Sequence, residues 1–150
     1  MLVALACLVA PMAWTDDGLR AAARRLIGAT HQAMVEAASS QAVHRLHYDV
    51  GAGTYWLSQV GTDGADIPIA VPLGARIALP GTIRFDEVTT VHQGRVAVGE
   101  AFTQFLPIGR TERTTIRLVD TADRRLTMTL MLNPLTGRVS VKDGDEDGRR

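Results

Sequence analysis

Two histidines and several hydroxyl and acidic side chains lie close together about a third of the way along the chain, where metal or nucleophilic chemistry could use them. His44 and His47 are three residues apart. In a strand, residues at this spacing face opposite sides of the sheet, so the pair is not expected to chelate a metal ion. Ser39 and Ser40 precede these histidines, and Asp49 follows them, but no Gly-x-Ser-x-Gly elbow surrounds either serine. The sequence therefore predicts no catalytic residue and no cofactor-binding residue.

Acidic residues alternate near the end of the sequence, in the order found at the opening of a calcium-binding loop. Asp143, Asp145 and Asp147 are followed by Gly148, and oxygen ligands at alternate positions before a glycine suit Ca²⁺. The bidentate acid that closes such a loop does not follow them. We therefore expect residues 143–150 to form a solvated acidic tail, with the three aspartates as the metal candidate.

The composition is that of an ordinary globular domain without a charge excess. The chain has 150 residues, of which 46% are hydrophobic and 21% charged, and this length suits one domain. Sixteen basic residues balance sixteen acidic ones, whereas general nucleic-acid binders usually carry a basic excess. The single cysteine, Cys7, excludes an internal disulfide and a multi-cysteine metal site.

The first 14 residues contain no charged side chain. As a helix this segment would be about 21 Å long, because each residue adds about 1.5 Å. A bilayer core is about 30 Å thick, so the segment is too short to span it alone. A secretory signal fits poorly, because no basic residue precedes the apolar run. The segment 1–14 is predicted to be part of a membrane helix.

An amphipathic helix is predicted over residues 15–41. Thr15 is a good N-cap, and the two aspartates after it favour the positive end of the helix dipole. Apolar and small side chains then recur every three or four residues, which is typical of a helix that buries one face. They are Leu19, Ala23, Leu26, Thr30, Met34 and Ala37. Two interpretations remain open for this face: an ordinary core helix, or the packing face of a filament stalk.

Residues 42–142 change to a period of two and are punctuated by Gly, Pro and Asp turns. Segments 43–50 and 54–60 are predicted to form one hairpin, and segments 115–119 and 126–132 a second one. Segment 61–74 is predicted to be a loop. We expect about seven strands in mainly antiparallel sheets. The predicted fold class is α+β, with one long N-terminal helix packed on this β-domain.

The ordered set of segments resembles the H-type minor pseudopilins of bacterial type II secretion and the related minor type IV pilins. The resemblance covers nearly the whole chain and is least in residues 61–95. It is carried by residues 1–6, by 19–37 running into a strand that ends near Asp49 and is followed by 53–56, and by the closing segments 105–109, 115–118 and 132–139. The family's prepilin cleavage signature, a Gly followed by Phe-Thr-Leu-Ile-Glu or close variants, is not found in this sequence. No prepilin-peptidase site is therefore assigned.

The resemblance implies a structural, non-enzymatic protein of the bacterial inner membrane, with its β-domain in the periplasm. Members of the family assemble helix to helix into a short filament that helps to expel folded proteins. The implied partners are other pseudopilins of the same filament, secreted protein substrates and the inner membrane, with no nucleic acid and no cofactor. Filament packing is expected through Leu19, Ala23, Leu26, Thr30, Met34 and Ala37.

Two alternatives remain. A minor pilin of type IV pili, acting in pilus assembly or DNA uptake, would share the fold but expose a basic patch for DNA. Such a patch could be formed by Arg110, Arg113, Arg124, Arg125 and Arg138, with Arg149 and Arg150 added to it. A secreted small-ligand-binding β-domain or enzyme would instead need a deep polar pocket with convergent acids or histidines.

Overall fold

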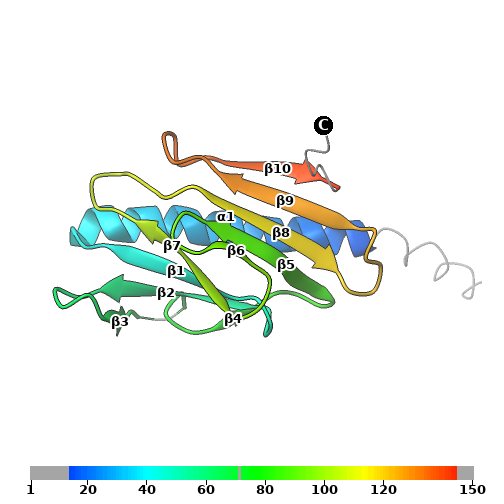
Figure 1. The fold of residues 1–150 in the computed structure, drawn as a ribbon, viewed down its shortest axis with the longest axis horizontal. Helices are drawn as coiled ribbons and strands as arrows, with labels where there is room; N and C mark the ends of the chain where they lie inside the picture. Colours follow the sequence, from blue (N-terminus) through cyan, green and yellow to red (C-terminus); the bar gives the residue numbers. More distant parts are fainter. Residues whose placement is uncertain (1–13, 71, 145–150) are drawn as a thin grey trace, which may run out of the picture.

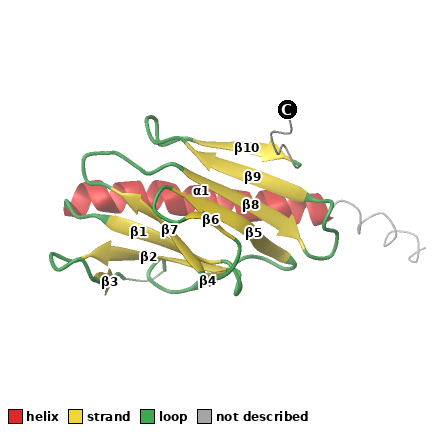
Figure 2. Cartoon of the chain, in the orientation of Figure 1, coloured by secondary structure: helices red, strands yellow, loops and turns green. Residues whose placement is uncertain are grey.

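One helix and ten strands make up the described part of the chain, which in this computed structural model comprises residues 14–70 and 72–144. The helix comes first and the strands follow it (Figure 2). The elements are α1 (Trp14–Ser40), β1 (His44–Asp49), β2 (Thr54–Val60), β3 (Asp66–Pro68), β4 (Ile77–Ala78), β5 (Ile83–Thr90), β6 (Gly94–Val96), β7 (Glu100–Phe105), β8 (Thr114–Asp120), β9 (Thr127–Leu132) and β10 (Val139–Asp143).

The strands form two antiparallel sheets that lie on the same side of α1 (Figure 1). The first sheet has the order β3-β2-β1-β7, with β4 also paired to β2, and the second has the order β10-β9-β8-β5-β6. Helix α1 contacts β1 and β7 of the first sheet and β5, β8 and β9 of the second. The prediction of an α+β fold with one long helix on antiparallel sheets is confirmed.

The number of strands differs from the expected seven, because three are only two or three residues long. The predicted loop 61–74 contains β3, and the short strand β6 precedes β7 as a separate strand. These short strands lie at sheet borders, where few side chains are buried and no alternating pattern builds up. In β5, a β-bulge between Phe85 and Glu87 lets the pairing with β8 continue as far as Thr90.

The core is the layer between α1 and the two sheets. The helix contributes Leu19, Leu26 and a row of alanines that includes Ala33, and small side chains let the strands approach closely. The sheets contribute larger side chains, chiefly Leu46, Tyr48, Leu57, Phe85, Val88, Phe105, Leu118, Met128 and Leu130. At about 1.5–3 kcal/mol for each large apolar side chain, this burial is what holds α1 against both sheets.

The helix ends with a left-handed residue rather than with a glycine. Gln41 has a φ of 51°, and its side-chain amide donates a hydrogen bond to the carbonyl oxygen of Ala38 at 2.6 Å. The hydroxyl of Ser40 donates to the carbonyl of Glu36 at 2.6 Å. Both side chains satisfy carbonyls of the last turn that have no partner within the helix.

Replacement of Gly28 by alanine is expected to stabilise the protein by about 0.5–1 kcal/mol, because glycine costs that much in a helix interior. Gly28 is exposed, and an added Cβ would meet no atom within 4 Å. Urea unfolding followed by circular dichroism measures the change. Gly137→Ala is the matched control and should destabilise, because Gly137 has a φ of 68° and its Cβ would lie 2.7 Å from Met34 Sδ. A loss of stability in Gly28→Ala would contradict the finding that Gly28 lies on the exposed side of α1.

Candidate interaction surfaces

The predicted packing face of the helix is buried inside this chain. Leu19, Ala23, Leu26, Thr30 and Ala37 have exposed fractions of 4% or less, and Met34 is half-buried against the same core. These six side chains contact the chain's own sheets, as the core-helix interpretation expects. Another protein chain could reach them only if α1 separated from the sheets. The exposed side of α1 carries other residues, among them Arg24, Gly28, Gln32 and Val35.

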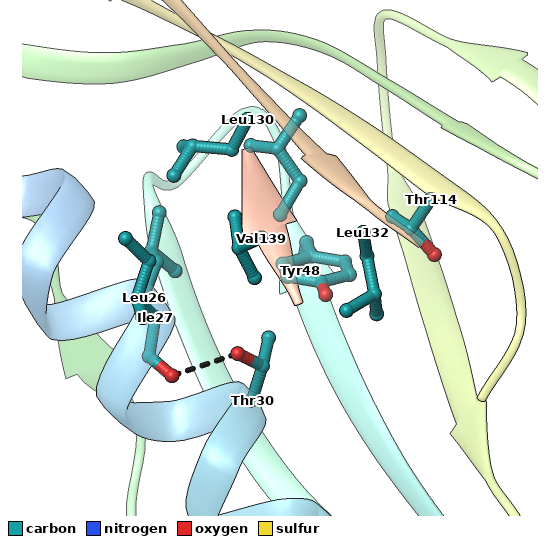
Figure 3. A pocket seen from close by; sticks show the side chains of 9 residues that line it. Leu26, Ile27, Thr30, Tyr48, Thr114, Leu130, Leu132 and Val139 are labelled. Atoms are coloured by element: carbon teal, nitrogen blue, oxygen red, sulfur yellow. Dashed lines mark hydrogen bonds between the residues drawn. The ribbon is translucent and has the colours of Figure 1, made fainter. Parts of the chain in front are cut away.

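A small cavity lies between α1 and the second sheet (Figure 3). It has a volume of about 10 Å³, which is room for about one water molecule. Its walls are mostly apolar and are formed by Leu26, Ile27, Thr30, Tyr48, Thr114, Ile116, Leu130, Leu132 and Val139. None of these residues is an acid or a histidine. The cavity therefore lacks both the size and the groups that the small-ligand alternative requires.

Three buried hydroxyl groups beside this cavity connect the two sheets. Tyr48 Oη on β1 lies 2.9 Å from Thr103 Oγ1 on β7, which lies 2.7 Å from Thr114 Oγ1 on β8. Burial raises the pKa of the Tyr48 phenol above its usual range, and the hydrogen bond with Thr103 opposes this only in part. Tyr48 is therefore a neutral structural group that satisfies its hydroxyl inside the core.

Aromatic rings and cations alternate on the outer face of the first sheet, which is the face turned away from α1. His47 on β1 stacks on Trp56 of β2, with 5.0 Å between the ring centroids, and the Arg76 guanidinium lies over the Trp56 ring at 4.0 Å from its centroid. Arg45, also on β1, lies over the Phe102 ring of the neighbouring strand β7, at 4.8 Å from the ring centroid. Such cation–π contacts favour the observed placement of both arginines. Trp, Arg and Phe are also the residue types enriched at protein–protein contacts.

His47 also belongs to a Ser-His-Asp group, but its geometry is not that of a hydrolase. His47 Nε2 lies 2.8 Å from Ser58 Oγ and 3.7 Å from Asp66 Oδ1, and Ser58 Oγ donates to the same carboxylate oxygen at 3.1 Å. A catalytic histidine instead uses one ring nitrogen for the serine and the other for the acid. The three side chains form a closed hydrogen-bonded cluster.

The triad residue types noted in the sequence are not brought together either. Ser39 and Ser40 hydrogen-bond the Glu36 carbonyl at the helix end. His44 is buried on the core side of β1, with Nδ1 3.0 Å from the Ala42 carbonyl oxygen. It therefore faces away from His47, as the strand spacing predicts.

The protein is expected to lose stability as the pH falls below about 6.5, and His47 is the cause. Burial lowers the pKa of the His47 imidazole from its ordinary 6.5, and Asp66 and Glu100 counteract this only in part. Between the lowered folded value and 6.5, the unfolded chain binds more protons, so the free energy of unfolding decreases with decreasing pH. Urea unfolding at neutral pH and at about pH 5 tests this. The variant His47→Gln should lose less stability on acidification than the wild type; an equal loss in both would contradict the assignment.

Sequence reasoning did not single out Trp56, Arg76, Phe102 or Arg45. The alternation in β1 and β2 indicates which of their side chains share a face, so it could have placed Arg45, His47 and Trp56 together. The pairing of β1 with β7 joins segments about 55 residues apart, such as His47 with Phe102. Nothing local in the sequence specifies that partner.

The five arginines considered as a basic patch are divided between the two ends of the molecule. Arg110, Arg113 and Arg138 lie at the β7–β8 and β9–β10 connections, whereas Arg124 and Arg125 lie in the β8–β9 turn at the opposite end (Figure 1). Strand β8 separates the groups by about 20 Å, at about 3.3 Å per residue. Arg125 also forms an ion pair with Asp123 at 3.0 Å. Arg149 and Arg150 lie outside the described residues.

The calcium candidate is only partly described. Asp143 ends β10, opposite Met128 of β9, whereas Asp145 and Asp147 lie outside the described residues. Within residues 14–70 and 72–144, no three His, Cys, Asp or Glu side chains are grouped so that they could hold a metal ion. The predicted membrane segment 1–14 likewise falls outside the described part except for Trp14, which begins α1. Over the part that is described, no helix has the length and apolar character needed to cross a bilayer.

One N-terminal helix packed across antiparallel sheets defines a pilin-like α+β fold. The chain is similar to two solved structures of EpsH, a minor pseudopilin of the type II secretion system of Vibrio cholerae. The first has 13% sequence identity and a TM-score of 0.64, with 85% of this chain and 98% of that chain covered. The second has 12% identity and a TM-score of 0.67, with 88% and 98% covered.

The chain is also similar to FimU, a type IV minor pilin of Pseudomonas aeruginosa. The sequence identity is 17% and the TM-score is 0.59, with 86% of this chain and 94% of that chain covered. No protein-family profile matches the sequence, and no curated protein does. At these identities the similarity shows the fold, and this is the fold that the sequence resemblance predicted.

Proposed function

We propose that this protein is a minor pseudopilin, a structural subunit of the periplasmic filament of type II secretion. The observation that carries the proposal is the fold shared with the EpsH structures, over 85% or more of this chain and 98% of theirs. Residues 1–14 would anchor the subunit in the inner membrane, the two sheets would face outward, and the partners would be other pseudopilins and secreted proteins.

The exposed side of α1 would then be the filament contact. Gly28 carries no side chain, and the exposed Gln32 and Val35 lie four and seven residues further along the same helix, so all three share one side. Small residues let two helix backbones approach closely. The residues that the sequence predicted for filament packing, such as Leu26 and Ala37, would support this contact from beneath by holding α1 on the sheets.

The experiment compares Gly28→Leu with Gly28→Ala in the host's envelope. Both chains should fold, because an added Cβ at Gly28 meets no atom within 4 Å. Chemical cross-linking followed by mass spectrometry should recover other pseudopilins with the wild type and with Gly28→Ala, and far less with Gly28→Leu. The same spectra give the native N-terminus. Recovery of no pilin-like protein with the wild-type chain would refute the proposal.

The second candidate is a minor pilin of type IV pili, favoured by the similarity to FimU. Cross-linked partners distinguish the two systems, because each candidate predicts its own set of pilins. A role in DNA uptake would need a basic surface, and Arg110, Arg113 and Arg138 are the three that lie at one end. Salt-dependent DNA binding lost on their joint replacement would favour this candidate.

A further inference from the structure

A groove lies at one end of the second sheet, on the face turned away from α1. It has a volume of about 640 Å³, and its floor is a row of paired residues across three strands, Thr115 on β8, Met131 on β9 and Ser140 on β10. The chain neighbours of Met131, Leu130 and Leu132, are buried in the core, so Met131 and its row point outward. The groove is therefore on the opposite face of the sheet from the small cavity beneath α1.

The β9–β10 turn forms one wall of this groove and projects at the end of the molecule (Figure 1). It presents Leu135, which has an exposed fraction of 92%. The Asn133 side-chain oxygen accepts hydrogen bonds from the amides of Leu135 and Thr136, at 2.9 and 3.4 Å, and the Gly137 amide donates to the Asn133 carbonyl at 2.8 Å. An apolar side chain on a turn that is already ordered costs little conformational entropy when a partner covers it.

Two arginines give the groove a positive charge. Arg113 lines it, and Arg138 lies at its border, where the Asn133 amide donates to the Arg138 carbonyl at 2.9 Å. This bond extends the β9–β10 pairing by one step, which places Arg138 and Asn133 on the outward face. In the part of the chain that the structure describes, no acid lines the groove and no carboxylate pairs with either arginine.

The other charged side chains near this face already have partners. Arg117 on β8 pairs with Asp86 at 3.3 Å, and Lys142 on β10 has an interaction of its own. The acid that is next to the groove in the sequence, Glu112, is hydrogen-bonded to His92. The unbalanced charge at the groove therefore comes from its two arginines alone.

We propose that this groove is a docking site for an acidic protein surface, which places an apolar side chain in the groove and carboxylates beside Arg113 and Arg138. The apolar side chain packs on Met131 and against Leu135. Each guanidinium can donate two parallel hydrogen bonds to a carboxylate, which is the strongest pairing available to it. The inference rests on the groove and its charge, and it stands whether or not the protein is a pseudopilin.

A second copy of this chain is a poor occupant when the same surfaces meet. Twofold contact through this end would bring Arg113 and Arg138 of both copies together, and the groove offers no acid to separate them. Such a juxtaposition of like charges costs several kcal/mol. Contact between the groove and a different surface of a second copy would appear as self-association, which the experiment below measures.

Nucleic acid, lipid and small molecules also fit the groove less well. Phosphate groups would pair with the two arginines, but they would leave the apolar floor unfilled. Met131 on that floor is half-buried, whereas Leu135 on the wall is almost fully exposed, so the floor is recessed. A small molecule that filled the floor would leave Leu135 in water. A protein surface can fill the floor and cover the turn at once.

The probe is a labelled peptide with one leucine between pairs of glutamates, and its binding to the full chain is followed by fluorescence anisotropy. One matched peptide has serine in place of leucine, and another has lysines in place of the glutamates. Each replacement should weaken binding by about tenfold or more, because both the apolar contact and the charge contribute.

Leu135→Ser tests the wall of the groove. The side chain is exposed, so the fold should persist while peptide binding weakens by about tenfold. Val98→Ser is the matched control, because Val98 is 86% exposed and lies in the β6–β7 connection, away from the groove. It should leave peptide binding unchanged.

Joint replacement of Arg113 and Arg138 by glutamine tests the charge and should weaken peptide binding by about tenfold or more. The matched control replaces Arg24 and Arg124 by glutamine, which makes the same change of net charge at exposed positions on α1 and in the β8–β9 turn. Equal losses in the two double variants would show a general charge effect and would overturn the proposal.

Four further results would overturn it. The first three are no binding of the glutamate–leucine peptide, equal binding of the three peptides, and binding that survives Leu135→Ser. The fourth is tighter binding of duplex DNA or of phosphatidylglycerol vesicles that depends on the two arginines, which would assign the surface to phosphate groups. Sedimentation of the full chain without peptide completes the test, because self-association that disappears in Leu135→Ser would assign the groove to a contact between copies.

Discussion

Leu26→Ala lowers the free energy of unfolding by about 3 kcal/mol, the largest loss that we expect from a single substitution in the helix. Leu26 has an exposed fraction of 1% and lies at the middle of the contact between α1 and the sheets. It already borders the cavity of about 10 Å³, so the deleted atoms would enlarge an existing void. Urea unfolding followed by circular dichroism measures the loss.

Val35→Ala provides the control on the opposite side of the same helix. Val35 is 45% exposed, so its truncation should change stability by about 0.5 kcal/mol or less. The comparison tests which side of α1 faces the sheets. Similar losses in the two variants would contradict the packing described here.

Thr103→Val is expected to cost about 2 kcal/mol, although valine has nearly the same shape. The change removes the central hydroxyl of the buried group that connects β1, β7 and β8. Tyr48 Oη is then left without its hydrogen-bond partner in the core, and an unsatisfied buried hydroxyl costs about 1–3 kcal/mol. Denaturant unfolding of the purified chain gives the value.

Tyr48→Phe distinguishes the central hydroxyl from the peripheral one. This variant removes one bond but leaves Thr103 bonded to Thr114, so a loss of about 1 kcal/mol is expected. The order of the two losses is the test. A larger loss of unfolding free energy in Tyr48→Phe than in Thr103→Val would mean that the three hydroxyls of Tyr48, Thr103 and Thr114 do not act as a connection between the sheets.

The helix and the long hairpins could be predicted because their signals are local. The three- to four-residue spacing from Leu19 to Ala37 marks the buried side of α1, and a period of two marks β1 with β2 and β8 with β9. The same spacing does not indicate whether this side of the helix packs against the chain's own sheets or against another protein. The chain's own sheets bury Leu26, so the side of α1 that was predicted for filament packing contacts the rest of this chain.

The group of aromatic and cationic side chains on the outer face of the first sheet could not be predicted, because it depends on strand pairing between distant segments. His47 and Trp56 come from one hairpin, but Phe102 reaches them only through the β1–β7 ladder. The bulge in β5 is a similar case. It lets the neighbouring acids Asp86 and Glu87 both approach Arg117, at 3.3 and 3.9 Å, although alternation alone would put them on opposite faces.

The direction of the strands gives the molecule an anisotropic mechanical strength. In Figure 1 the long strands of both sheets run close to the direction of the α1 axis. The hydrogen bonds between antiparallel strands are perpendicular to them. A load that enters through α1 and leaves through the strands therefore shears whole rows of hydrogen bonds together. A load applied across the strands would instead peel β10 from β9 one bond at a time, so the fold should resist pushing and pulling along the strands better than across them.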